Sequence, residues 1–196
     1  MKMLVTGGNR GLGKFLVENF DATSVSRSSG HDIVQHASAI AQLSLDYDVF
    51  VNNAFDGPPH ESWANFGQVQ VLYKIYETWK KENKKGTIIN IGSIGEKSIK
   101  EPEPMFETYR CAKAALAYAS KQCTAAFKNN FIPFKTTLIT LDRLDTELSR
   151  SRSNWTGNGI NLKAVCDFIN YLLTVDANTC IEEITLYCNM DYESNN

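Results

Sequence analysis

A glycine-rich segment near the start of the chain places the strongest constraint on its fold. The octapeptide TGGNRGLG (residues 6–13) follows the apolar run KMLVT, and residues 11–20 then carry apolar side chains at helical spacing. Glycine loses the most backbone freedom on folding, so four glycines in eight positions indicate a backbone that turns tightly and approaches a neighbour closely. Between a strand and a helix, such a loop predicts phosphate binding at the helix N-terminus, with an ordinary glycine-rich turn as the alternative.

Apolar strand-like runs and helical stretches alternate along the rest of the chain. Strands are expected at residues 2–6, 22–26, 31–34, 47–54, 86–93, 134–141 and 182–188, the third of them very short. Helices are expected at residues 11–20, 39–45, 61–82, 106–128 and 161–174. The alternation predicts an α/β fold, a parallel sheet with helices on both faces, in one domain over residues 1–190 with a polar tail at 191–196.

The composition excludes several classes of function. With 20 Lys and Arg against 22 Asp and Glu, the net charge of -2 gives no general attraction to nucleic acid or to an anionic membrane. No apolar run is long enough to span a bilayer, and the first apolar stretch is too short for a signal peptide. The five cysteines include no C-x-x-C pair, and the three histidines stand at no metal-ligand spacing relative to them. We therefore expect no metal site, five buried and inert thiols, and a reducing, cytoplasmic location.

The spacing T-G-x-x-x-G-x-G resembles the glycine motif of the classical short-chain dehydrogenase/reductase (SDR) family. Further motifs follow in that family's order, and they are VNNAF (51–55), INIGS (89–93) and YRCAK (109–113). The resemblance covers nearly the whole chain and implies a Rossmann-like, doubly wound parallel sheet in the order 3-2-1-4-5-6-7, trimmed because the chain is short. It also implies an oxidoreductase acting on a carbonyl or alcohol of a small molecule.

The resemblance assigns catalysis to Ser93, Tyr109 and Lys113. Tyr109 and Lys113 stand at i and i+4 and so fall on one face of a helix, although such a pair alone would more often be a surface contact. A free tyrosine has a pKa of about 10, and a nearby cation lowers it toward the range useful for proton transfer. Tyr109 is then expected to protonate a carbonyl oxygen that Ser93 hydrogen-bonds, while Lys113 holds the nicotinamide ribose. The family's catalytic asparagine aligns with Asn65, with Gln70 or an ordinary polar position as alternatives.

The resemblance also implies a nicotinamide cofactor. The residues it assigns to cofactor binding are Thr6, Gly7, Gly8, Asn9, Arg10, Gly11, Leu12, Gly13, Ser26, Arg27, Ser28, Asp32, Ile33, Asn53, Ala54, Tyr109, Lys113 and Thr146. No carboxylate ends the second expected strand to grip the ribose 2′-hydroxyl of NAD. Arg27 stands there instead, and together with Arg10 it favours the 2′-phosphate of NADP(H) over NAD(H), with two solvated arginines as the alternative.

The sequence departs from the family pattern at two places. Phe55 replaces the usual glycine of the asparagine motif, and Asp142-Arg143 stand where Pro-Gly is expected before Thr146. These departures keep open a catalytically reduced NADP(H)-binding regulator or sensor, while the glycine spacing and short C-terminal half disfavour an epimerase or dehydratase. The helices expected at 61–82 and 106–128 correspond to the family's dimer interface, so we expect a homo-oligomer that binds a small-molecule substrate, without nucleic acid or membrane.

Overall fold

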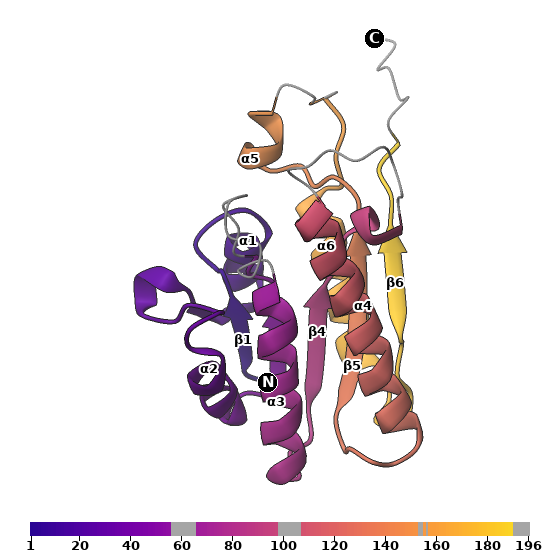
Figure 1. The fold of residues 1–196 in the computed structure, drawn as a ribbon. Coiled ribbons are helices and arrows are strands. Elements are labelled where there is room, and N and C mark those ends of the chain that lie inside the picture. The colour runs from indigo at the N-terminus through magenta and orange to yellow at the C-terminus, as the bar shows by residue number, and fades with distance from the viewer. Residues whose placement is uncertain (56–65, 98–106, 153–154, 156, 190–196) are drawn as a thin grey trace.

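The structure, a computed structural model, describes residues 1–55, 66–97, 107–152, 155 and 157–189. Figure 1 shows one sheet with helices packed along it and with the labelled strands pointing the same way. The described sheet has six strands, all parallel, in the order β2-β1-β3-β4-β5-β6. Their bounds are β1 Met3–Thr6, β2 Thr23–Val25, β3 Val49–Asn52, β4 Thr87–Ile91, β5 Lys135–Leu141 and β6 Glu183–Leu186. This arrangement confirms the predicted doubly wound α/β fold.

Five of the described α-helices overlap the intervals that the apolar periodicity predicted, and the short helix α5 was not predicted. They are α1 Gly11–Phe20, α2 Ala37–Leu43, α3 Gly67–Lys81, α4 Glu107–Lys128, α5 Glu147–Arg150 and α6 Leu162–Thr174. Left-handed residues follow three of them, with Asp21 closing α1, Asn83 following α3 and Asn130 following α4. The first residues of the helix expected at 61–82 lie outside the described part of the chain.

Alternate residues of the strands face two separate cores, as expected for a sheet buried on both sides. Leu4 and Phe50 pack with apolar side chains of α2, α3 and α4 on one face. Val5 and Val51 pack with α1 and α6 on the other face. Trp79 of α3 is fully buried, and its indole N–H donates to the Ser44 hydroxyl at 2.8 Å. The two helical layers thereby fix the carboxyl ends of the strands, where ligands bind in open α/β sheets.

The prediction of a third strand at residues 31–34 is wrong. Residues 31–34 form a turn in which the Asp32 carboxylate accepts hydrogen bonds from the backbone N–H groups of Val34 (2.7 Å) and Gln35 (3.1 Å). Those N–H groups are therefore unavailable to a strand ladder. The short 3₁₀ segment Arg27–Ser29 and the left-handed Gly30 precede this turn, so the chain returns directly to α2. The third of the seven expected strands is thus replaced by a capped turn, and the described sheet has six strands.

Two other expectations concern the surface and the thiols. Within the described residues, no helix combines the length and apolar character needed to cross a bilayer. No disulfide joins any two of the five cysteines, and Cys123 and Cys166 are buried. Cys180 and Cys188 are only half-buried, and Cys111 is exposed on α4, so the expectation of five buried thiols is wrong. Cys111 faces outward because its neighbours Ala112 and Lys113 take the inward face of the helix.

Candidate active site

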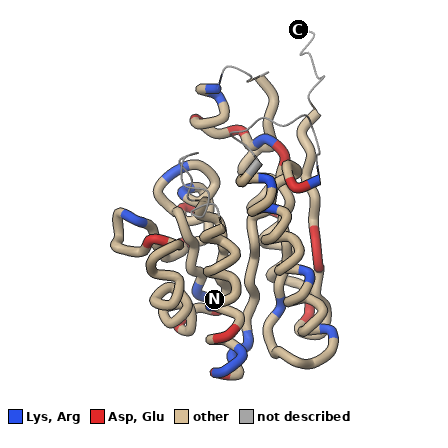
Figure 2. The backbone as a smooth tube through the Cα atoms, viewed as in Figure 1, with Lys and Arg blue, Asp and Glu red and all other residues tan. Residues whose placement is uncertain are grey.

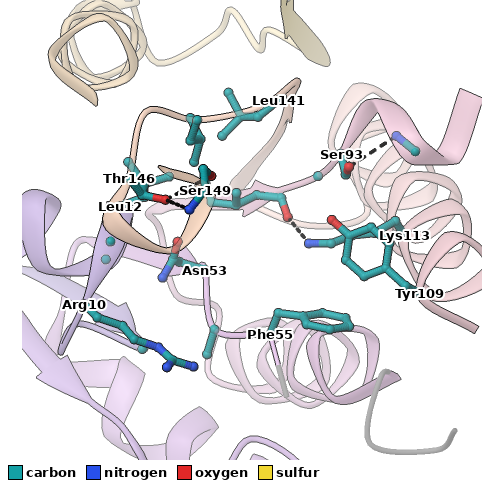
Figure 3. Close-up of a pocket in the computed structure, with 18 of the residues that line it drawn as sticks. Arg10, Leu12, Asn53, Phe55, Ser93, Tyr109, Lys113, Leu141, Thr146 and Ser149 are labelled. Atoms are coloured by element: carbon teal, nitrogen blue, oxygen red, sulfur yellow. Dashed lines mark hydrogen bonds between the residues drawn. The ribbon is translucent and has the colours of Figure 1, made fainter. Parts of the chain in front are cut away.

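A pocket of about 930 Å³ opens at the carboxyl ends of the strands. Sixteen of the predicted site residues line it, and they are Gly7, Asn9, Arg10, Gly11, Leu12, Gly13, Ser26, Arg27, Ser28, Ile33, Asn53, Ala54, Ser93, Tyr109, Lys113 and Thr146. Figure 3 shows Ser93, Tyr109, Lys113 and Phe55 on one side of this space and Arg10, Leu12 and Thr146 on the other. The structure therefore brings the glycine loop and the expected catalytic residues to one cavity.

The glycine loop is shaped by close approach of backbone to backbone. Gly7 has φ +73°, and a Cβ there would lie 3.0 Å from the Cα of Ala54. A Cβ at Gly13 would overlap the Gly7 carbonyl oxygen, so this glycine lets α1 pack directly against the loop. Gly11 also has positive φ, and a Cβ there would meet only a Thr146 methyl at 3.8 Å. The loop therefore leaves its backbone open toward the pocket, which fits a phosphate-bearing cofactor.

Three predicted cofactor residues do not line the pocket. Thr6 is fully buried, and its hydroxyl accepts hydrogen bonds from the backbone N–H groups of Asn53 and Ala54, both at 2.9 Å. A Cβ at Gly8 would overlap the Ser24 side chain, so this glycine packs the loop onto β2. Asp32 caps the turn described above. Thr6 and Gly8 hold the loop in place, whereas Asp32 shapes the segment before α2.

The far end of the pocket joins the glycine loop to the segment after β2. The amide nitrogen of Asn9 donates to the hydroxyl of Ser26 at 3.0 Å and to that of Ser28 at 2.6 Å. Arg10 and Arg27 are exposed at this end and both line the pocket. These five residues line one pocket, and the sequence prediction did not include the hydrogen bonds between the serine hydroxyls and Asn9.

The opposite end of the pocket is buried around Lys113. Its side chain is 4% exposed, and its Nζ donates to Gln68 Oε1 at 2.7 Å and to the Ile91 carbonyl at 2.8 Å. Burial lowers the pKa of Lys113 to about 7, and the negative charge of Glu96 opposes that shift. Lys113 therefore titrates near neutral pH, and a neutral amide, not a carboxylate, accepts its hydrogen bond.

Gln68 is the buried hydrogen-bond partner of Lys113, and the sequence prediction missed it. It is 2% exposed on α3, and its amide nitrogen donates to the Asn52 carbonyl at 2.7 Å. Asn52 in turn donates to Asn90 Oδ1 at 2.9 Å, and Asn90 donates to the Ser120 hydroxyl at 3.0 Å. A buried network of hydrogen bonds thus joins Lys113 through Gln68, Asn52 and Asn90 to Ser120. The expected fourth catalytic residue, Asn65, lies outside the described residues.

Tyr109 lies at the mouth of this buried end. Burial raises its pKa above the ordinary tyrosine value, and a hydrogen bond with Ser93 and the positive charge of Arg152 oppose the rise. Lys113 Nζ lies 5.7 Å from the Tyr109 ring centroid. Without a cofactor, Lys113 therefore does not lower the pKa of Tyr109 as expected. Tyr109 stays protonated at neutral pH.

Comparison with solved structures places this geometry in a known architecture. A serine dehydrogenase complexed with NADP+ superposes with a TM-score of 0.74 at 16% identity, over 100% of this chain and 98% of that one. A betaketoacyl-ACP reductase from Bacteroides thetaiotaomicron superposes with a TM-score of 0.70 at 19% identity, over 96% and 97% of the two chains. A short-chain dehydrogenase from Burkholderia cenocepacia J2315 with NADP gives 0.67 at 19% identity, over 95% and 90%.

This chain has the short-chain dehydrogenase/reductase fold. No protein-family model and no curated protein sequence matches it. The structure shows what Phe55, the first departure from the family motifs, contacts. The Phe55 ring packs edge-on against Tyr109 with centroids 4.8 Å apart, and Lys113 Nζ lies 5.4 Å from the Phe55 centroid. Phe55 therefore adds an apolar wall beside Tyr109 and Lys113.

The second departure lies after β5. The Asp142 carboxylate accepts a hydrogen bond from the Arg143 backbone N–H at 2.7 Å, which turns the chain where Pro-Gly was expected. Thr146 caps α5, since its hydroxyl accepts from the Ser149 N–H at 3.2 Å. The predicted position of Thr146 beside the pocket is retained, although its hydroxyl is engaged in the cap. Among the described residues, no three His, Cys, Asp or Glu side chains are grouped as metal ligands.

Proposed function

We propose that this chain is a short-chain oxidoreductase that uses NADP(H) to reduce a small-molecule carbonyl, or to oxidise the alcohol. The observation that carries the proposal is the gathering of Ser93, Tyr109 and Lys113 in the pocket that the glycine loop borders. A phosphate-binding loop alone would fit any nucleotide-binding protein. A protonated phenol, a serine hydroxyl and a buried lysine beside it supply groups for proton transfer to a carbonyl oxygen.

The chemistry of each side chain follows from its surroundings. The bound nicotinamide would supply the hydride to the carbonyl carbon. Tyr109 would donate its proton to the carbonyl oxygen, which becomes the alcohol hydroxyl, and its raised pKa keeps that proton in place at neutral pH. Ser93 would hydrogen-bond the same oxygen. Lys113 would hold the nicotinamide ribose and return a proton to Tyr109, a transfer favoured by its pKa of about 7.

We propose NADP(H) as the preferred cofactor. The pocket volume suits a dinucleotide, and the open glycine backbone fits its pyrophosphate. Several structures of similar fold are complexed with NADP, and others, such as a 4-hydroxyisoleucine dehydrogenase, are complexed with NADH. The choice between the two therefore rests on Arg10 and Arg27, whose guanidinium groups suit a 2′-phosphate.

We also propose that the protein is cytoplasmic and forms a homo-oligomer through α3 and α4. Tyr73 of α3 is 41% exposed, and its hydroxyl donates to Gln122 of α4 at 3.0 Å. Tyr118 of α4 is 66% exposed, so these two helices present aromatic side chains outward. Analytical ultracentrifugation of the wild type and Tyr118→Glu tests this, because a charge at a subunit contact would shift the species toward monomer.

A second candidate function is a NADP(H)-binding regulator that does not turn over. It is favoured by the packing of Phe55 on Tyr109 and by the engagement of Lys113 Nζ with Gln68. A screen of ketones, aldehydes, quinones and pterins, followed by the loss of NADPH absorbance, separates the two candidates. Turnover of at least one carbonyl, absent in Tyr109→Phe, supports the oxidoreductase. Tight NADPH binding without turnover of any compound supports the regulator.

A further inference from the structure

The pocket is much more cationic than the chain as a whole. The chain has a net charge of -2, and Figure 2 shows basic and acidic segments at both ends of the sheet. The lining of the pocket nevertheless contains six Lys and Arg residues and one acidic residue, Asp142. Arg10 and Arg27 belong to the proposed cofactor end, and Lys113 belongs to the catalytic group. Three arginines, which we call the substrate-side arginines, have no role in the proposed reaction, and they are Arg110, Arg143 and Arg152.

All three substrate-side arginines line the pocket, and two of them lie near Tyr109. Arg110 follows Tyr109 on α4, and a Cβ built on Gly95 would lie 3.5 Å from the Tyr109 ring and 3.8 Å from Arg110 Cγ. Arg152 is close enough for its charge to lower the pKa of Tyr109. The guanidinium of Arg143 lies 5.9 Å from the Trp155 ring centroid. Arg110 and Arg152, which come from two separate segments, therefore bring positive charge near Tyr109.

The acidic side chains near these arginines are engaged elsewhere. The Asp142 carboxylate bonds the Arg143 backbone, and its other oxygen lies 3.4 Å from the Cys188 N–H. Asp145 forms a two-point ion pair with Arg150, at 2.6 and 2.9 Å. In the described part of the chain, neither Arg110 nor Arg152 forms an ion pair with a carboxylate. Glu96 is close enough for its negative charge to raise the pKa of Tyr109, so it offsets part of the positive charge there, and a bound anion would pair with the arginines themselves.

We propose that the substrate carries an anionic group, a carboxylate or a phosphate, which Arg110 and Arg152 bind beside the carbonyl that Tyr109 protonates. The proposal rests on the proposed oxidoreductase function and names its substrate class. A guanidinium binds either oxyanion by two parallel, charge-assisted hydrogen bonds, and a low-dielectric pocket strengthens them. A neutral ketone would leave these guanidinium groups without a partner in the complex. The site thereby discriminates against neutral carbonyl compounds.

Matched substrates test the proposal directly. We expect short keto acids to be reduced with kcat/KM at least about tenfold above their methyl esters, since a hydrogen bond to a charged group contributes roughly 1.5–3 kcal/mol. A second pair, dihydroxyacetone phosphate against dihydroxyacetone, distinguishes a phosphate from a carboxylate. In Arg152→Ala and Arg110→Ala, kcat/KM should fall about tenfold more for the acid than for the ester. Arg150→Ala is the matched control, because Arg150 is exposed and pairs with Asp145.

A binding measurement separates failure of this proposal from failure of the proposed function. Malonate and inorganic phosphate are titrated by calorimetry into the NADPH-bound protein, and at least one should bind in a saturable manner that Arg110→Ala/Arg152→Ala abolishes and Arg150→Ala retains. Binding of this kind without any carbonyl turnover would support the anion site and overturn the oxidoreductase. Turnover in which esters equal acids would overturn the anion site and leave the oxidoreductase standing. Loss of NADPH affinity in Arg110→Ala/Arg152→Ala, equal to the loss of substrate affinity, would also overturn the proposal, because the arginines would then bind the cofactor.

Discussion

The two ends of the pocket are built in opposite ways. At the nucleotide end, Arg10 and Arg27 are exposed, and the exposed Asn9 donates hydrogen bonds to the hydroxyls of Ser26 and Ser28. At the reaction end, Lys113 is 4% exposed and Gln68 is 2% exposed, and both belong to a network that reaches Ser120. Solvent can replace a lost partner at the first end. At the second end a lost partner leaves a buried polar group unsatisfied, which destabilises the protein by about 1–3 kcal/mol.

The difference predicts how each end responds to substitution. Changes at the nucleotide end should alter which cofactor binds and leave stability nearly unchanged. Changes at the reaction end should alter protonation, turnover and stability together, because the same hydrogen bonds serve all three. Measuring cofactor affinity and the free energy of unfolding in the same variants therefore distinguishes the roles of the two ends.

The largest effect is expected at Lys113. Lys113→Met keeps most of the side-chain length but removes the amine that bonds Gln68 and the Ile91 carbonyl. Because the proton relay to Tyr109 is then broken, kcat should fall by roughly 10²-fold or more. Lys121→Met on the same helix is the control, since Lys121 is exposed and pairs only with Glu183 at 3.5 Å. Equal kcat in Lys113→Met and the wild type would remove Lys113 from the mechanism.

The next effect is expected at Arg27 of the nucleotide end. Arg27→Ala removes one guanidinium from the proposed 2′-phosphate site, so the preference for NADPH over NADH should shrink by roughly 10- to 100-fold. The ratio of the two Kd values, measured by cofactor fluorescence, reports this. Lys14→Ala on α1 is the control, because Lys14 is exposed and pairs with Glu18. An unchanged ratio in Arg27→Ala would overturn the cofactor assignment.

Gln68 should link turnover to stability. Gln68→Leu removes the buried hydrogen bonds that Gln68 makes with Lys113 and with the Asn52 carbonyl, so the free energy of unfolding should fall by about 1–3 kcal/mol in urea titrations. Gln68→Glu instead places a carboxylate against Lys113, which raises the pKa of Lys113 above about 7. The Lys113 limb of the pH–kcat profile should therefore move to higher pH in Gln68→Glu. A profile that matches the wild type would show that Gln68 is only a packing residue.

The smallest effect is a pH dependence of stability. Lys113 has a pKa of about 7 in the folded protein and about 10.4 when unfolded, so the unfolded chain binds more protons between these values. The free energy of unfolding should therefore rise between pH 7 and about pH 8. Burial raises the pKa of Cys123 to about 12, so this thiol lowers the free energy of unfolding as the pH rises further. This effect is the same in the wild type and in Lys113→Met. Urea unfolding should show a steeper rise in the wild type than in Lys113→Met, and equal slopes would contradict the burial of an ionisable Lys113.

The nucleotide end could be predicted from the sequence because its determinants are local. Gly11–Phe20 matches the predicted helix at both ends, and the glycine spacing alone placed Gly7 and Gly13 at the loop. The predicted strand at 31–34 failed for a local reason as well, since Asp32 offers the backbone a competing hydrogen bond.

The reaction end depends on contacts between distant parts of the chain. Gln68 bonds Lys113 across 45 residues, and no local motif encodes that contact. One signal was present, because Gln68 lies at helical spacing from the buried Val71, Leu72 and Ile75. A polar residue on the buried face of an amphipathic helix requires a buried partner. The packing of Phe55 on Tyr109 likewise needs the position of α4, which the sequence alone does not fix.

The most direct test of the central claim compares the wild type with Tyr109→Phe in a single-turnover reaction, with NADPH bound and a carbonyl substrate in excess. The substitution removes only a hydroxyl, so NADPH should bind with unchanged affinity. Because that hydroxyl supplies the proton to the carbonyl oxygen, the rate of NADPH oxidation should fall by roughly 10²- to 10⁴-fold. An unchanged rate in Tyr109→Phe would contradict the assignment of Tyr109 as the general acid and base.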